Sequence, residues 1–116
     1  MSWMDNCDWV RVERKSHQYV DAERRKLTSS KKDAFRRMVA QDVGIEYAEA
    51  KKQICHHIVP LSLGGKESNH NKVLCDPYLE YLIHNFIDGQ TDGMLVGATR
   101  VILIPRFSGQ YWRYEP

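Results

Sequence analysis

The sequence lacks the features that mark membrane proteins, secreted proteins and repeat proteins. Among its 116 residues, the longest apolar runs, such as 101–104, are far too short to span a bilayer. The first five residues show no basic region followed by an apolar stretch, so no secretory signal is visible and we expect a cytoplasmic protein without a membrane partner. No repeat, low-complexity segment or domain boundary stands out, which predicts a single domain over residues 1–116.

Cysteine is scarce, and its arrangement excludes two further classes. The chain has only Cys7, Cys55 and Cys75. An odd number of cysteines without a C-x-x-C pair argues against a disulfide framework and against a four-cysteine structural zinc site. We therefore expect reduced, mostly buried thiols.

Charge is unevenly distributed, although the formal net charge is only +2. Residues 9–37 hold ten basic and four acidic residues, a local net charge of +6, which leaves the remainder of the chain acidic. A basic segment of this kind suits a polyanion such as nucleic acid. A solvated helix face is the alternative interpretation of the same charges.

The N-terminal part, residues 1–52, is expected to be basic and helical. Residues 1–16 show no clear pattern, and 17–27 are expected to form a short basic helix. A helix over 31–43 is predicted from a capping pattern of Ser30 with Asp33, a stop at Gly44, and apolar residues at helical spacing. These apolar residues are Phe35, Met38, Val39 and Val43. Residues 45–52 are expected to add one or two helical turns.

Two short strands are expected next. Residues 53–59 predict a strand, which Pro60 and the Gly64-Gly65 pair interrupt with a loop. Residues 71–75 predict the second strand.

A helix is expected directly after the second strand. Asp76 is a good N-cap and Pro77 suits the first helical position. Gly89 is expected to end the helix, and a last strand over 99–104 precedes an aromatic tail over 106–116. The helix has a clean apolar stripe of Leu79, Leu82, Ile83, Phe86 and Ile87. Together these elements predict an α+β fold.

The most informative residues lie in this strand–loop–strand–helix segment. They are the doublet His56-His57 followed by Ile58-x-Pro60, then Gly64-Gly65, Asn71 and His84. With these residues, 53–88 resembles the HNH nucleases, also called the His-Me finger or ββα-metal superfamily, and the small size resembles phage-type members. The resemblance implies a ββα-metal finger core over 53–88, with the N-terminal helices and the C-terminal strand (within 89–116) packed around it. It also implies a metal-dependent DNA endonuclease.

The resemblance assigns a role to each of these polar residues. Hydrolysis of a phosphodiester needs a base for water and a cation on the phosphate, and a histidine titrates near neutral pH. By resemblance, His57 is the general base, and Asn71 ties the two strands and orients His57, with Asn69 as an alternative. His56 matches the first metal ligand. Neighbouring strand residues point to opposite faces, so His56 and His57 serve one site only where the strand is irregular.

The helix is expected to supply the remaining metal ligands. His84 matches the metal-binding histidine of the family, and Glu80, four residues earlier, faces the same way. Asp88 is an alternative to Glu80. A carboxylate at this position favours one Mg²⁺ or Mn²⁺ ion over Zn²⁺.

The expected partner is DNA, most naturally double-stranded, in a bacterial or phage-infected cell. The family implies products with a 5′ phosphate and a 3′ hydroxyl, and double-strand cuts by a one-site enzyme would favour a homodimer. Two alternatives stay open: a catalytically inactive nucleic-acid-binding or protein-inhibiting module, and an accessory subunit of a phage packaging or restriction complex. The expected phosphate contacts, which carry no sequence information, come from Arg14, Arg24, Arg25, Lys32, Arg36 and Arg37.

Overall fold

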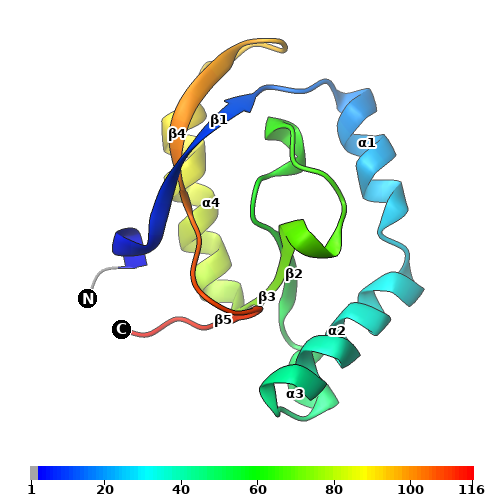
Figure 1. The fold of residues 1–116 in the computed structure, drawn as a ribbon. Coiled ribbons are helices and arrows are strands. Elements are labelled where there is room, and N and C mark those ends of the chain that lie inside the picture. The colour runs from blue at the N-terminus through cyan, green and yellow to red at the C-terminus, as the bar shows by residue number, and fades with distance from the viewer. Residues whose placement is uncertain (1–2) are drawn as a thin grey trace.

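An antiparallel ribbon brings the two ends of the chain together in the computed structural model, which describes residues 3–116 and has an α+β fold (Figure 1). A short 3-10 turn, Trp3–Asn6, leads into β1 (Cys7–Glu13), which pairs along its whole length with β4 (Thr99–Pro105). The sequence pattern predicts no element for residues 1–16, so β1 is a correction. Its inward-facing valine, Val12, is buried against the core.

The basic N-terminal part forms three helices, which follow one another along one side of the central hairpin and its loop in Figure 1. They are α1 (His17–Lys26), α2 (Ser29–Val43) and α3 (Tyr47–Ala50). The predicted capping pattern at Ser30 is wrong, because Thr28 caps α2 by accepting a hydrogen bond from the backbone N–H of Lys31 at 3.2 Å. Gly44 ends α2 with a positive φ of 77°, as its sequence position predicts.

The central hairpin is formed by β2 (Ile54–His57) and β3 (Lys72–Cys75), which pair antiparallel with His56 opposite Val73. The aromatic tail adds a third strand, β5 (Tyr111–Trp112), parallel to β3. The sequence predicts no strand in this tail. Trp112 is nonetheless buried there, so the tail closes one end of the hairpin instead of trailing into solvent.

Helix α4 (Pro77–Thr91) follows β3 directly and begins as predicted. The Asp76 carboxylate accepts hydrogen bonds from the backbone N–H groups of Tyr78 and Leu79. Gly89 does not end the helix, which continues to Thr91. The helix continues because its last turn is tied to β4: the Gln90 side chain donates to the Leu103 carbonyl and accepts from the Leu103 N–H, each at 2.8 Å.

The core lies where α4 packs between the ribbon and the hairpin. Its buried side chains come from β1, β4, the hairpin and the apolar stripe of α4, for example Val12, Ile102, Val73, Leu79 and Ile83. A second cluster packs α2 and α3 against β3. This packing fixes one face of α4 beside β2. None of the helices within residues 3–116 is both long and apolar enough to cross a lipid bilayer.

Candidate active site

One pocket of about 380 Å³ lies between the N-terminal helices and the hairpin. Its walls come from α1, α2, β2, the loop after β2 and α4. It brings together six of the residues predicted from the sequence. These are Arg24, Lys32, His56, His57, Glu80 and His84.

His56 and His57 point to opposite sides of β2 and still line this one pocket at the end of the strand. His56 is only 3% exposed, and its ring centroid lies 5.9 Å from that of His84 and 5.7 Å from that of Trp112. His57 instead contacts Glu67 in the loop between the strands. The two imidazoles are therefore available for different tasks.

One ring nitrogen of His56, Nε2, is a buried polar atom without a hydrogen-bond partner among the described residues. Burial lowers the pKa of His56 to about 3, with smaller contributions from His84 and His57, so the ring is neutral at pH 7. An unsatisfied buried group costs about 1–3 kcal/mol. A neutral imidazole nitrogen in this situation is well suited to bind a cation.

His84 and Glu80 lie one turn apart on α4 and face the same way, as their spacing predicts. Nε2 of His84 lies 3.0 Å from Oε1 of Glu80, and the His84 side chain is 56% exposed. An ion about 2.1 Å from two imidazole nitrogens would place their ring centroids roughly 5–6 Å apart. The separation of 5.9 Å between His56 and His84 fits that arrangement.

The proposed metal ligands are not yet arranged around one point in this conformation. Within residues 3–116, no group of three or more His, Cys, Asp or Glu side chains is arranged to hold a metal ion. Glu80 and His84 bond each other, so that contact has to open before both side chains can reach a shared ion. Asp88, the alternative to Glu80, is exposed and does not line the pocket.

His57 is held by a hydrogen bond that the sequence does not predict. Its Nε2 atom lies 3.1 Å from Oε1 of Glu67, and the same carboxylate bonds the Lys72 ammonium at 3.0 Å. Burial lowers the pKa of His57, and the Glu67 hydrogen bond only partly offsets this effect. The ring is therefore neutral at pH 7 and able to accept a proton.

Asn71 fastens the loop between the strands to the end of β2. Its side-chain oxygen accepts from the backbone N–H of Val59 at 2.9 Å, and its amide donates to the carbonyls of Val59 and Lys66 at 3.0 Å each. Asn71 lies in a 3-10 turn, Asn69–Asn71, directly before β3 and not on the strand. Asn69 is exposed. The side-chain contact to His57 comes from Glu67, so Asn71 acts on the loop backbone.

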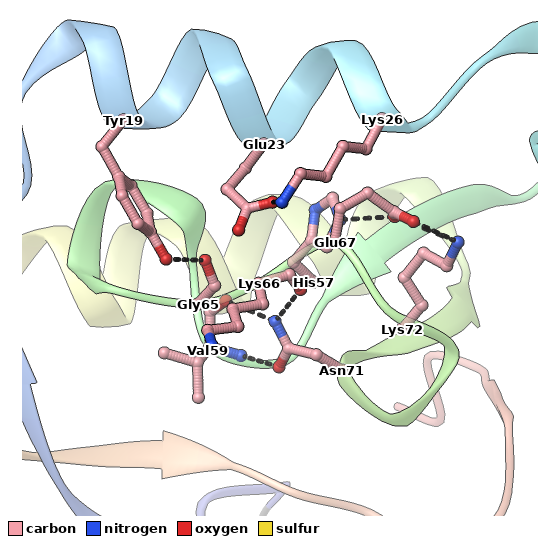
Figure 2. A network of polar contacts seen from close by, with 10 residues as sticks. All are labelled: Tyr19, Glu23, Lys26, His57, Val59, Gly65, Lys66, Glu67, Asn71 and Lys72. Atoms are coloured by element: carbon pink, nitrogen blue, oxygen red, sulfur yellow. Dashed lines mark hydrogen bonds and ion pairs between the residues drawn. The ribbon is translucent and has the colours of Figure 1, made fainter.

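Gly65 is the position in this loop where only glycine fits. A Cβ atom there would lie 1.9 Å from the Val59 carbonyl oxygen and 2.9 Å from the Asn71 amide nitrogen. From α1, the Tyr19 hydroxyl lies 3.1 Å and 2.9 Å from the carbonyl oxygens of Gly64 and Gly65. Figure 2 shows the Tyr19 hydroxyl at the carbonyl of Gly65 and the Asn71 side chain between Val59 and Lys66.

Gly65→Ala should destabilise the protein by about 3 kcal/mol or more, because the methyl group collides with backbone that cannot move away. Gly89→Ala is the matched control: Gly89 lies inside α4 with no atom near its Cβ position. That change should stabilise the protein by about 0.5–1 kcal/mol. Urea unfolding of both variants measures the difference, and equal midpoints would contradict the tight packing at Gly65.

The predicted phosphate-binding residues differ in their surroundings. Arg14 donates to the Thr91 carbonyl at the end of α4, and Arg36 donates to the Gln53 carbonyl, so both support the fold. Arg37 pairs with Asp33 at 3.0 Å and covers the Tyr47 ring. Arg25 is exposed on α1 but does not line the pocket. The pocket itself receives only Arg24 and Lys32 from this set.

The cysteines are unpaired thiols, as expected, but they are not mostly buried, because Cys7 and Cys55 are partly exposed. Cys75 is fully buried, and burial raises its pKa to about 12. Cys55 lines the pocket, and burial raises its pKa as well. A protonated thiol is a poor nucleophile and a poor metal ligand, so the chemistry of the pocket rests on its imidazoles and carboxylates.

Comparison of the chain with models of protein families, with curated protein sequences and with solved structures finds no match.

Proposed function

We propose that this chain is a metal-dependent endonuclease that hydrolyses DNA phosphodiester bonds, with β2, β3 and α4 as a ββα-metal finger. The observation that carries the proposal is the unpartnered, buried Nε2 atom of His56 beside the ring of His84. His57 lies next to them in the same pocket with a neutral ring. A cation site and a proton acceptor are thus adjacent, which is what water attack on a phosphodiester requires.

Each residue then has a separate task. His56, His84 and Glu80 would hold one divalent cation, and the Glu80 carboxylate makes Mg²⁺ or Mn²⁺ more suitable than Zn²⁺. When bound, this ion supplies positive charge for the phosphate and for the departing 3′ oxygen. His57 accepts the proton of the attacking water. Asn71 and Gly65 keep the loop beside His57 in place.

A nicking assay tests the proposal. Supercoiled plasmid is incubated with the protein and Mg²⁺ or Mn²⁺, with an excess of chelator as the control. The proposal predicts relaxed circles that require the ion. Intact plasmid under all conditions would count against it.

The contact between Glu80 and His84 favours a second candidate function. If these two side chains stay bonded to each other, His56 is the one member of the proposed ligand set left to bind an ion. In that case, the chain is a nucleic-acid-binding module that keeps the finger but does not cleave. Binding of DNA without nicking, unaffected by chelator, would distinguish this candidate from the nuclease.

Arg24 and Lys32 are expected to contact the phosphates of the substrate, because they are the cations from the basic segment that line the pocket. Removing both with R24A/K32A should reduce the slope of log affinity against log salt by about 2. The control K51A/K52A removes the same charge from exposed positions at the end of α3. Fluorescence anisotropy with a labelled duplex measures both, and equal slopes for the two variants would contradict docking at the pocket.

A further inference from the structure

Two buried charged side chains, those of Glu67 and Lys72, adjoin His57 at the pocket wall. The Glu67 carboxylate is 4% exposed and receives two partners: His57, and the Lys72 ammonium, which is 1% exposed. Oε1 of Glu67 lies 3.1 Å from Nε2 of His57 and 3.0 Å from Nζ of Lys72, while its Oε2 lies 3.1 Å from the same ammonium. Figure 2 shows the carboxylate between the imidazole on one side and the ammonium on the other.

This contact fixes which nitrogen of His57 carries hydrogen. An ionised carboxylate can only accept hydrogen bonds, so the hydrogen of the neutral ring must be on Nε2. Nδ1 is then the only ring atom of His57 with a free lone pair. The Lys72 ammonium lies 3.0 Å from Oε1 of Glu67 and so compensates the negative charge of this buried carboxylate.

The loop that carries Glu67 is held from three directions. The Asn71 amide donates to the carbonyl of Lys66, the residue directly before Glu67. The Tyr19 hydroxyl holds the backbone at Gly65, and the absence of a side chain there allows the loop to lie against Val59. The carboxylate is therefore presented to His57 by a rigid segment, as positioning requires.

We propose that Glu67 is a positioning residue for the general base, an inference that rests on the proposed nuclease function. It accepts a hydrogen bond from Nε2–H of His57, so that Nδ1 takes the proton of the attacking water. As that proton moves to Nδ1, the water oxygen bonds to phosphorus and the bond to the 3′ oxygen breaks. The 3′ oxygen leaves with the electron pair of that bond and takes a proton from solvent water to become the 3′ hydroxyl. The resulting imidazolium has its positive charge beside the Glu67 carboxylate, which stabilises it.

Two double variants separate the hydrogen bond from the ion pair. E67L/K72M replaces both charged groups with apolar side chains of similar size, so no unpaired charge is buried. E67Q/K72M loses the same ion pair but keeps an oxygen that can accept from His57. Thermal unfolding and metal titration are the controls that test whether each variant folds and binds Mn²⁺.

We expect E67L/K72M to lower kcat for plasmid nicking about 10- to 100-fold with little change in KM. E67Q/K72M should recover most of that loss. Equal kcat values in the two variants would overturn the proposal, because a purely structural ion pair is absent from both. A drop confined to KM would overturn it as well.

The ring hydrogen is observed directly by ¹⁵N–¹H correlation spectra of the histidine side chains at pH 7.5, with His57 assigned from its Ala variant. The proposal predicts hydrogen on Nε2 with a downfield resonance, present in the wild type and lost in E67L/K72M. If the wild type nicks DNA but carries the ring hydrogen on Nδ1, the role of Glu67 is overturned and the proposed nuclease function is not. If the wild type shows the Nε2–H signal but does not cut DNA, the proposed nuclease function is overturned, and the catalytic role of the contact between Glu67 and His57 falls with it.

Discussion

His57→Ala is expected to lower the rate of plasmid nicking by about 10³-fold. The side chain lines the pocket and has a neutral ring at pH 7, because burial lowers its pKa. Without it, the pocket has no other base for the same water among the described residues, since the His56 nitrogen is assigned to the cation and Glu80 bonds His84. The truncation removes few core contacts because His57 is not part of either apolar cluster. The variant should therefore stay folded and still bind Mn²⁺.

His70→Ala is the matched control for this prediction. His70 is exposed in the 3-10 turn before β3 and does not line the pocket, so its loss should leave the rate unchanged. The pH dependence gives a second check. The base works when neutral, and its pKa lies below the usual value of about 6.5, so the rate of the wild type should rise with pH and pass its half-maximal value below that pH. Undiminished nicking by His57→Ala would reject this residue as the base.

His56→Leu is expected to abolish stabilisation by metal ions. A bound ion stabilises the native protein by about 2.7 kcal/mol at a hundred times its Kd. The leucine variant has no nitrogen at this position, so its free energy of unfolding should be the same with and without Mn²⁺. Without metal it should be more stable than the wild type by about 1 kcal/mol, because the unpartnered polar atom is gone.

Thermal unfolding with and without Mn²⁺ measures this effect, and plasmid nicking should fall together with it. His17→Leu is the control, since His17 is exposed at the start of α1 and away from the pocket. Equal stabilisation of the wild type and His56→Leu by the ion would show that the ion binds elsewhere.

Local sequence signals predict the middle of the fold well. The start of α4 follows from Asp76 and Pro77, and its buried face follows from the spacing of Leu79 and Ile83. These features act within one or two helical turns, so they can be recognised in the sequence without knowledge of the tertiary structure. The position of Gly44 at the end of α2 is legible for the same reason.

The missed elements depend on partners far away in the chain. Strand β1 is stabilised by β4, with Cys7 paired to Pro105, and β5 is a two-residue strand that exists because β3 offers a free edge. Gly89 is a reasonable helix end by its type, yet the packing of α4 against the ribbon carries the helix two residues further. Tertiary contacts override local propensity at these points.

Part of the candidate site was predictable and part was not. Glu80 and His84 come together because residues four apart share a helix face, and the structure places them 3.0 Å from each other. Glu67 sits in an irregular loop where no periodicity applies, so its contact with His57 has no signal in the sequence. The basic segment appears uniform in sequence, but the fold turns Arg14, between β1 and α1, and Arg36, on α2, toward backbone carbonyls.

A crystal soaked in Mn²⁺ and measured at a wavelength where manganese scatters anomalously offers the most direct test of the pocket. The expected result is a single strong peak at bonding distance from Nε2 of His56 and from the His84 ring, with His57 unligated and in contact with Glu67. A peak bound to His57, or one found only outside the pocket, would contradict the assignment of His56 and His84 as metal ligands and of His57 as the general base.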